Sequence, residues 1–208
     1  PLPAGQGTGL GKPLKLINHP RREDIPIYVA SLGPKNVEMT AEVADGWLPF
    51  LFLPEKAKEV WGEALAAGAA KRPPDLGPLE ISAGGMVAIG EDVKGLLDFM
   101  RPMYALYFGG MGARGKNFHH DVAVRLGYEA EAKKVQDLYL DGKKEEAAAA
   151  LPAELIDSVA LVGPKDRVRD RLAAYRDAGV GTIITTPMAW DVEARSTQRP
   201  HDLVGDVL

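Results

Sequence analysis

The fold class is decided by residues 25–36, which read IPIYVASLGPKN. The apolar, β-branched run 25–31 is typical of a strand buried on both faces of a parallel sheet. Gly33-Pro34 ends this strand, and the proline suits the first turn of a helix predicted over 34–44, because no N–H donor is needed there. A buried strand followed at once by a helix predicts a β/α unit in a parallel sheet covered by helices.

The same alternation recurs along the rest of the chain. We expect further strands at 46–50, 79–89 and 180–186, and helices over 54–70, from Asp92, and over 164–178. The Gly84-Gly85 pair predicts a bulge or a close backbone approach within the third strand. Residues 93–150 hold several helical stretches without a strand between them, broken at glycines 109–110, 112, 115, 127 and 142, and are interpreted as a helical insertion. The order is therefore β-α-β-α-β-(helical insertion)-α-β, and its four strands match half of a (β/α)8 barrel.

The ends of the chain differ in composition from the predicted half barrel at 25–190. Residues 1–24 are rich in Gly, Pro and charge and predict a loop or linker, and residues 191–208 predict a polar tail, either a weak helix or disordered. The sequence begins Pro1-Leu2-Pro3 without an initiator Met. We interpret it as a fragment or a processed product.

Composition excludes several classes of function. The net charge of −4 provides no basic surface for a phosphate backbone, so nucleic acid is not an expected partner. The chain has no cysteine, which removes disulfides, thiol nucleophiles and cysteine-based metal sites and is typical of a reducing compartment, so we expect a cytoplasmic protein. The sequence contains neither a run of about 18 apolar residues nor a signal-like N-terminus, so we expect no membrane span.

The turn from Ser31 to Asn36 is the strongest candidate site. The free N–H groups and positive dipole end of a helix attract phosphate, Gly33 permits close approach of a ligand, and Lys35 or Asn36 offers further donors. The alternative interpretation is an ordinary helix start after a strand. A second Gly-Pro-Lys at 163–165 fits a solvated helix end better than a phosphate site.

The segment 104–120 combines aromatic residues, glycines and two cations and is predicted to form a lid or a pocket wall. Its partial matches to a Walker loop and to a Rossmann fingerprint lack the strand that each motif requires before it. The adjacent His119 and His120 would point about 100° apart on a helix and make a poor chelate, so we expect no metal site. Asp45 is expected to have a structural role at the barrel edge.

Several segments together resemble the luciferase-like family of F420-dependent oxidoreductases and flavin-utilising monooxygenases. They are GLGKPLKL at 9–16, IPIYVA with GPKN at 25–36, AEVADGW at 41–47, YFGGMGARGKNF at 107–118, VGPKDR at 162–167 and AGV at 178–180. No single motif is decisive, but the series runs in order along nearly the whole chain.

This resemblance implies the fold and the chemistry. The family fold is a (β/α)8 barrel with a helical insertion, so the chain would be its C-terminal half, strands five to eight, and would lack the first four strands. In the family, the Gly-Pro turn after the fifth strand helps to hold the coenzyme phosphate, which implicates Ser31, Leu32, Gly33, Pro34, Lys35 and Asn36. The implied activity is hydride transfer between coenzyme F420 and a small organic substrate, and FMN is the alternative cofactor. No catalytic residue is assigned.

Two alternatives remain open. One is that the chain alone is inactive, as a half barrel whose open sheet edges require a second copy, in a dimer or larger homo-oligomer, or the missing N-terminal half. The other is an unrelated barrel that binds sugar phosphates.

Overall fold

Five parallel strands form a single sheet in the computed structural model of the protein, which describes residues 6, 17–19, 21–22 and 24–188. The strands follow the order β1-β2-β3-β4, and β5 also pairs with β3. In the register of the first three strands, Gly46 lies beside both Tyr28 and Glu80. The strand bounds are β1 (Tyr28–Val29), β2 (Gly46–Trp47), β3 (Glu80–Ile89), β4 (Leu161–Gly163) and β5 (Val180–Pro187).

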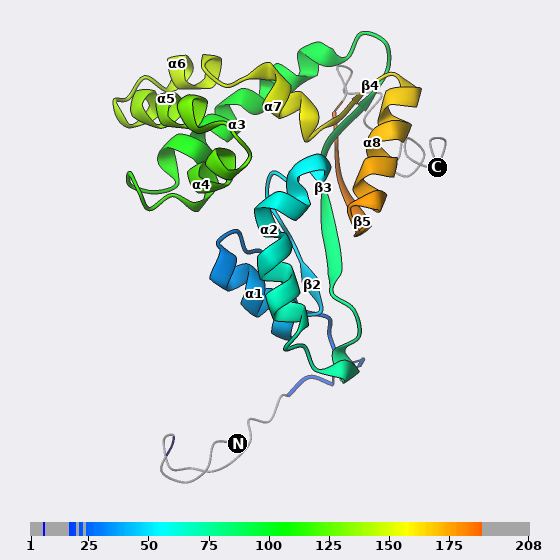
Figure 1. Cartoon of the computed structure of the whole chain (residues 1–208). Helices are drawn as coiled ribbons and strands as arrows, with labels where there is room; N and C mark the ends of the chain where they lie inside the picture. The colour runs from blue at the N-terminus through cyan, green and yellow to red at the C-terminus, as the bar shows by residue number, and fades with distance from the viewer. Residues whose placement is uncertain (1–5, 7–16, 20, 23, 189–208) are drawn as a thin grey trace.

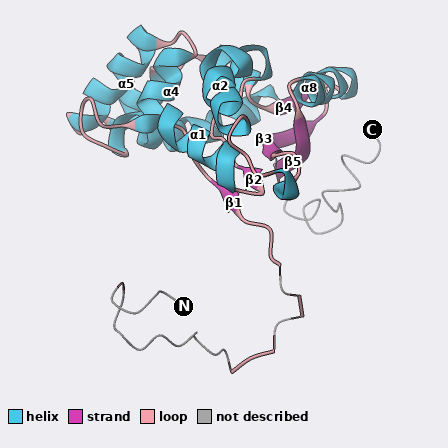
Figure 2. Cartoon of the chain, turned by 60° about the horizontal axis from the view of Figure 1, so that its bottom comes forward, coloured by secondary structure: helices cyan, strands magenta, loops and turns pink. Residues whose placement is uncertain are grey.

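Helices α1 (Pro34–Val43), α2 (Pro54–Ala69) and α8 (Lys165–Asp177) lie together on one side of the sheet (Figure 2). The largest fully buried side chains, Trp47, Trp61 and Tyr175, come from β2, α2 and α8. The ring centroids of Trp47 and Trp61 are 5.3 Å apart in an edge-to-face arrangement. The core therefore forms between this helical layer and the sheet, as expected for β/α units.

The chain between β3 and β4 is helical and forms a lobe beside the sheet (Figure 1). The 3₁₀ helix η1 (Pro74–Leu76) precedes β3. The lobe and the segment that leads back to the sheet contain the 3₁₀ helix η2 (Lys94–Met100), α3 (Arg101–Ala105), the π-helix η3 (Leu106–Gly110), α4 (Phe118–Arg125), α5 (Glu129–Leu140), α6 (Lys144–Ala149) and α7 (Ala153–Ser158).

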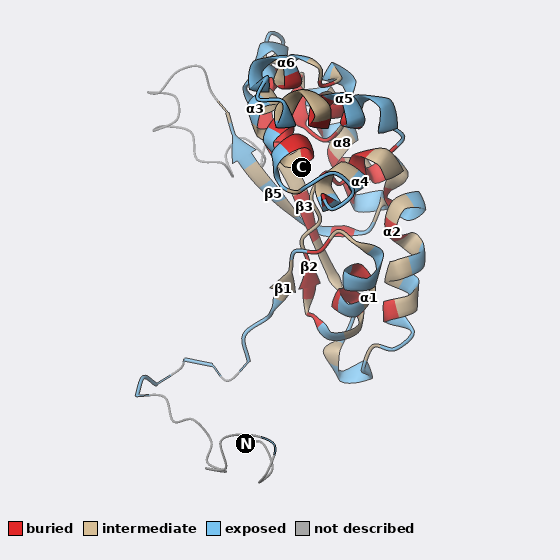
Figure 3. Cartoon of the chain, turned by 90° about the vertical axis from the view of Figure 1, so that its left-hand side faces the viewer, coloured by how far each residue is buried: buried red, intermediate tan, exposed pale blue. Residues whose placement is uncertain are grey.

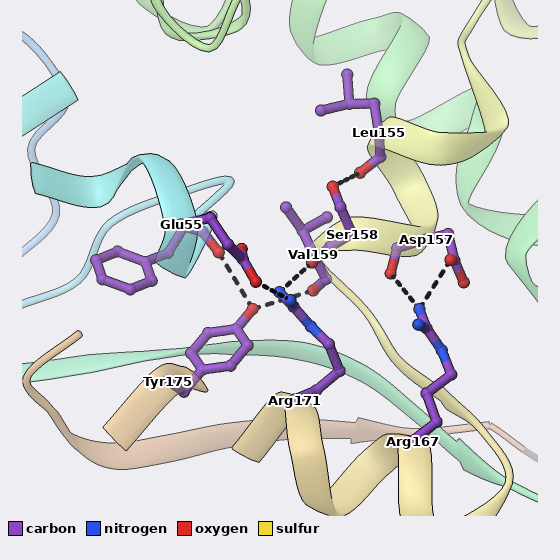
Figure 4. A network of polar contacts seen from close by, with 9 residues as sticks. Glu55, Leu155, Asp157, Ser158, Val159, Arg167, Arg171 and Tyr175 are labelled. Atoms are coloured by element: carbon purple, nitrogen blue, oxygen red, sulfur yellow. Dashed lines mark hydrogen bonds and ion pairs between the residues drawn. The ribbon is translucent and has the colours of Figure 1, made fainter. Parts of the chain in front are cut away.

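The α7–β4 segment is fastened to α8 and α2 by two arginines (Figure 4). Arg171 donates to the Ser158 carbonyl at 2.5 Å and forms an ion pair with Glu55. Arg167 pairs with the Asp157 carboxylate at 2.8 Å. These contacts hold β4 against the upper part of β3, where Val87 to Ile89 pair with it.

The order of strands and helices follows the sequence prediction, with corrections in detail. The sheet has five strands rather than four, because residues Leu161–Gly163, for which no strand was predicted, form β4. The first strand is limited to Tyr28–Val29, since β2, its one described partner, pairs over only two residues. The helix expected from Asp92 is a 3₁₀ helix that starts at Lys94. The predicted tail 191–208 and most of the linker 1–24 lie outside the described residues.

The glycines of the insertion and of β3 allow close packing. At Gly109 and Gly110, where a break was expected, the chain forms a π-helix, and an added Cβ would lie 2.3 and 2.5 Å from the Tyr139 side chain. Gly84 has a φ of 153°, and an added Cβ there would lie 2.1 Å from the Ile184 carbonyl oxygen. The close approach predicted for β3 is confirmed.

The second face of the sheet has no described helix packed on it (Figure 2). The Tyr28 ring crosses this face over Gly46, where an added Cβ would lie 2.1 Å from the ring. The Tyr28 hydroxyl donates to Glu80 at 2.5 Å, and Thr182 of β5 donates to the same carboxylate. A polar network therefore connects β1, β3 and β5 on an open face, and β5 is largely exposed (Figure 3).

Candidate functional site

The turn after β1 is held in place by hydrogen bonds to its carbonyl groups. The Ser31 carbonyl accepts from the Trp47 indole at 2.9 Å. The Leu32 carbonyl accepts from the Trp61 indole at 3.3 Å and from the Arg125 guanidinium at 2.8 Å. Since two tryptophans and an arginine hold these carbonyls, the backbone geometry of the turn is fixed before any ligand binds.

Helix α1 begins directly after this turn. Gly33 has an extended conformation and its carbonyl accepts from the Asn36 and Val37 amides, both at 3.0 Å, while Pro34 occupies the first turn. The Thr40 hydroxyl donates to the Asn36 carbonyl at 2.7 Å, so the Ser31 hydroxyl, 2.9 Å away, is the donor to Thr40. No side chain caps the helix, so its positive dipole end is available to an anion.

A cavity of about 240 Å³ lies at this turn, where β1 and β2 end. The turn itself supplies Ser31, Leu32, Gly33 and Asn36. The remaining walls are Ala30, Leu48, Phe50, Phe118 and His119. The cavity is thus mainly apolar and aromatic, with a helix N-terminus and few polar side chains, as small-molecule sites commonly are.

One wall of the cavity comes from the helical insertion. His119 packs edge-to-face against Phe50 and Tyr107, with ring centroids 5.1 and 4.7 Å apart, and Phe50 stacks on Tyr107 at 4.5 Å. Phe118 lies over Gly33, where an added Cβ would be 3.4 Å from its ring. These contacts bring the insertion onto the Ser31–Asn36 turn.

Helix α4, which carries Phe118 and His119, is fixed at both ends. The buried Asn117 amide group donates to the Tyr107 and Phe108 carbonyls at 2.8 and 2.9 Å. Its oxygen accepts from the backbone amides of His119 and His120. At the other end of α4, Arg125 donates to the Leu32 carbonyl and at 3.2 Å to that of Val60. Helix α4 is therefore placed relative to both the π-helix and the turn after β1.

Burial affects the charges near the cavity. Desolvation lowers the pKa of His119, so its imidazole is neutral at pH 7. Desolvation also lowers the pKa of Arg125, while Asp121 opposes this shift, and the guanidinium stays charged. The site accordingly combines a neutral imidazole with a positive helix end and a fixed cation.

The structure brings together four of the six residues singled out from the sequence: Ser31, Leu32, Gly33 and Asn36 line the cavity. Pro34 and Lys35 are exposed and do not line it. The sequence prediction did not include Leu48, Phe50 and His119 among the site residues. The segment 104–120, expected to form a lid or pocket wall, contributes Phe118 and His119, and its aromatic content was the available signal.

Other sequence expectations can be placed directly. Asp45 accepts a hydrogen bond from the Ile27 amide at 2.7 Å, which confirms its structural role at the edge of the sheet. The described residues contain no group of three His, Asp or Glu that could hold a metal ion. No described helix is both long enough and apolar enough to span a membrane.

The chain belongs to the luciferase-like monooxygenase family, whose model matches residues 7–182. The resemblance inferred from the sequence is thereby confirmed. The parallel α/β fold corresponds to about half of the (β/α)8 barrel enzymes of this family.

Two curated relatives are informative. The chain is 42% identical over 189 residues to the Mycobacterium tuberculosis protein provisionally named coenzyme F420-dependent oxidoreductase Rv3520c, covering 89% of this chain and 54% of that protein. It is 26% identical over 168 residues to the phthiodiolone/phenolphthiodiolone dimycocerosates ketoreductase of Mycobacterium bovis, covering 76% of this chain and 42% of the relative. The chain thus spans about half the length of the curated relatives it matches.

Two solved structures share the fold. The coenzyme F420-dependent tetrahydromethanopterin reductase from Methanopyrus kandleri superimposes with a TM-score of 0.63 at 22% identity, over 88% of this chain and 50% of that one. An F420-dependent secondary alcohol dehydrogenase in complex with an F420-acetone adduct gives a TM-score of 0.53 at 15% identity, over 89% and 48%. At these identities the likeness concerns the fold.

Proposed function

We propose that the chain is the C-terminal half of a barrel oxidoreductase that transfers a hydride between coenzyme F420 and a small organic substrate. The observation that carries this proposal is the cavity at the Ser31–Asn36 turn, lined by Ser31, Leu32, Gly33 and Asn36. Support for F420 comes from the relative named as F420-dependent that is 42% identical over 89% of this chain.

The residues present fit the anionic end of such a coenzyme. The uncapped N-terminus of α1 faces the cavity and lacks an acidic residue in its first turn, so no carboxylate there opposes an anion. Gly33 has no side chain, and even an added Cβ would make only a van der Waals contact of 3.4 Å with Phe118, so the backbone of the turn is accessible to a ligand. We propose that the turn binds the coenzyme phosphate through backbone N–H groups.

The chain's own contribution is to position the coenzyme. The bound coenzyme supplies the hydride chemistry, and the protein orients it. Trp47, Trp61 and Arg125 hold the carbonyls of the turn, so its backbone need not reorganise on binding. The aromatic side chains of Phe50, Phe118 and His119 form one wall of the same cavity.

The test is a titration of coenzyme F420, and separately of FMN, into the protein expressed from its complete reading frame, followed by fluorescence. We expect saturable F420 binding that is tighter than FMN binding. Binding of FMN alone would instead support an FMN-dependent luciferase-like monooxygenase. Binding of neither cofactor would overturn the oxidoreductase proposal.

A second candidate concerns the chain by itself. The sheet has an open face crossed by the Tyr28–Glu80–Thr182 network, and Ile184 on β5 is 46% exposed. Parallel sheets are normally covered on both faces. We therefore also propose that the 208-residue chain alone is inactive and self-associates, or pairs with an N-terminal half, through this face.

A further inference from the structure

His119 has features that packing alone does not explain. It lines the cavity and is half-buried, with its ring against Phe50 and Tyr107. Within the described part of the chain, neither ring nitrogen has a hydrogen-bond partner, although Asn117 holds the backbone amide of the same residue. The ring nitrogens are therefore free to bond an atom of a ligand in the cavity.

We propose that His119 is a ligand-binding residue of this cavity and donates a hydrogen bond to a phosphate oxygen of the molecule held at the Ser31–Asn36 turn. The inference rests on the proposed function for the location of the ligand and adds a residue of the helical insertion that binds it. The ligand class is a phosphate ester, or inorganic phosphate as its simplest member.

The geometry supports a donor at this position. Phe118, the neighbour of His119, lies against Gly33, so α4 reaches the turn itself. Asn117 and Arg125 fix the two ends of α4, and Arg125 does so by bonding Leu32 of the same turn. The imidazole therefore lines the same cavity as the start of α1, on a helix whose position does not depend on a ligand.

Few charges near His119 compete with this role. Tyr107 of the π-helix and Phe50 after β2 pack on the ring and are uncharged at neutral pH. On α4 itself, Asp121 lies 3.5 Å from His120, and Arg125 is directed to the Leu32 and Val60 carbonyls. Ser31 and Asn36 of the turn are uncharged, and Lys35 of α1 is exposed. Burial lowers the pKa of His119, and a bound phosphate would raise it by favouring the imidazolium.

The experiment is a proton NMR pH titration of the histidine ring signals, with the protein expressed from its complete reading frame. Inorganic phosphate is the probe, and sodium chloride at matched ionic strength is the control. The His119 signal is assigned by its loss in His119→Phe, which keeps an aromatic ring against Phe50 and Tyr107. His120→Phe is the matched control, because His120 is adjacent but does not line the cavity.

We expect phosphate to raise the pKa of His119, and to do so equally in the His120→Phe variant. His119→Phe should weaken F420 binding by roughly tenfold, the effect of one hydrogen bond to a charged group, without changing the melting temperature. An unchanged His119 pKa at saturating phosphate would overturn the inference even if F420 binds. A raised pKa in a protein that fails to bind F420 would support the phosphate contact and overturn only the proposed cofactor.

Discussion

At the residue scale, Asn117 connects two parts of the insertion through a single side chain. It joins two carbonyls of the π-helix region to two backbone amides of α4, and it is 1% exposed. One amide group therefore sets the position of Phe118 and His119. This role could not be predicted from the sequence, because the contacts of Asn117 depend on the π-helix ten residues earlier.

Replacing Asn117 should destabilise the protein. We expect Asn117→Ala to lower the free energy of unfolding by about 2–4 kcal/mol, because it removes the helix cap and leaves two carbonyls without their donor. Asn117→Ser retains a capping oxygen and should lose about half as much. Urea denaturation measures both, and equal stabilities for all three proteins would contradict the assigned role.

The lowered pKa of His119 predicts a pH dependence of stability. Below the unfolded value of about 6.5, the unfolded chain binds more protons at this residue than the folded chain does. The contribution of His119 to the free energy of unfolding is therefore fully present above that pH. It is lost as the pH falls toward the pKa that His119 has in the folded protein. Between pH values of about 7.5 and 5.5 the wild type should lose more unfolding free energy than His119→Phe. Parallel losses in urea denaturation would argue against the shift.

At the element scale, the close contact between α1 and α2 depends on one glycine. An added Cβ at Gly68 would lie 2.2 Å from the Glu38 carbonyl oxygen and 2.6 Å from the Ala41 methyl group. At Gly62 of the same helix, the nearest atom would be the flexible Lys58 side chain at 3.3 Å. The two glycines of α2 therefore have different constraints, which the sequence alone does not reveal.

This difference predicts opposite effects of the same substitution. Gly68→Ala should destabilise the protein by about 1–3 kcal/mol, because backbone must move to admit the methyl group. Gly62→Ala should stabilise it by up to about 1 kcal/mol through helix propensity, provided that the Lys58 side chain moves aside. Thermal denaturation of both variants checks the prediction, and equal destabilisation by both would contradict the close α1–α2 contact at Gly68.

Some of the helices and strands could be predicted from the sequence, and others could not. The alternation of apolar, strand-like runs with helical stretches predicted the order of the β/α units and most of their bounds, including those of helices α1, α2 and α8. The short strand β4 was not predicted, because its three residues form a strand only beside Val87 to Ile89 of β3. The π-helix was read as a break, because the packing of Tyr139 on Gly109 and Gly110 is a tertiary effect.

At the scale of the whole molecule, we expect the open face of the sheet to govern association. The turn at the site could be singled out from residues 31–36, since a helix start after a strand is a local feature. The aromatic wall could not be predicted in full, because Phe50 and His119 meet only through the fold of the insertion. The face of the sheet that a partner would cover could not be predicted from the sequence either.

The open face predicts self-association of the 208-residue chain. We expect sedimentation equilibrium to show a dimer or larger species, because exposed apolar residues and unpaired strand edges favour contact. Ile184→Glu on the open face should shift the equilibrium toward monomer, whereas Met39→Glu on α1, similarly exposed at 42%, should not. A monodisperse monomer for the unmodified chain would contradict this expectation.

The most direct test of the central claim compares two substitutions of Gly33 by fluorescence titration of coenzyme F420 into the protein expressed from its complete reading frame. Gly33 has an extended backbone, and an added Cβ would only contact Phe118 at 3.4 Å, so Gly33→Ala should bind almost as the unmodified protein does. Gly33→Asp places a carboxylate at the start of α1 and should weaken binding by roughly a hundredfold through repulsion of the phosphate. Equal affinity of the Ala and Asp variants would show that the coenzyme phosphate does not bind at this turn.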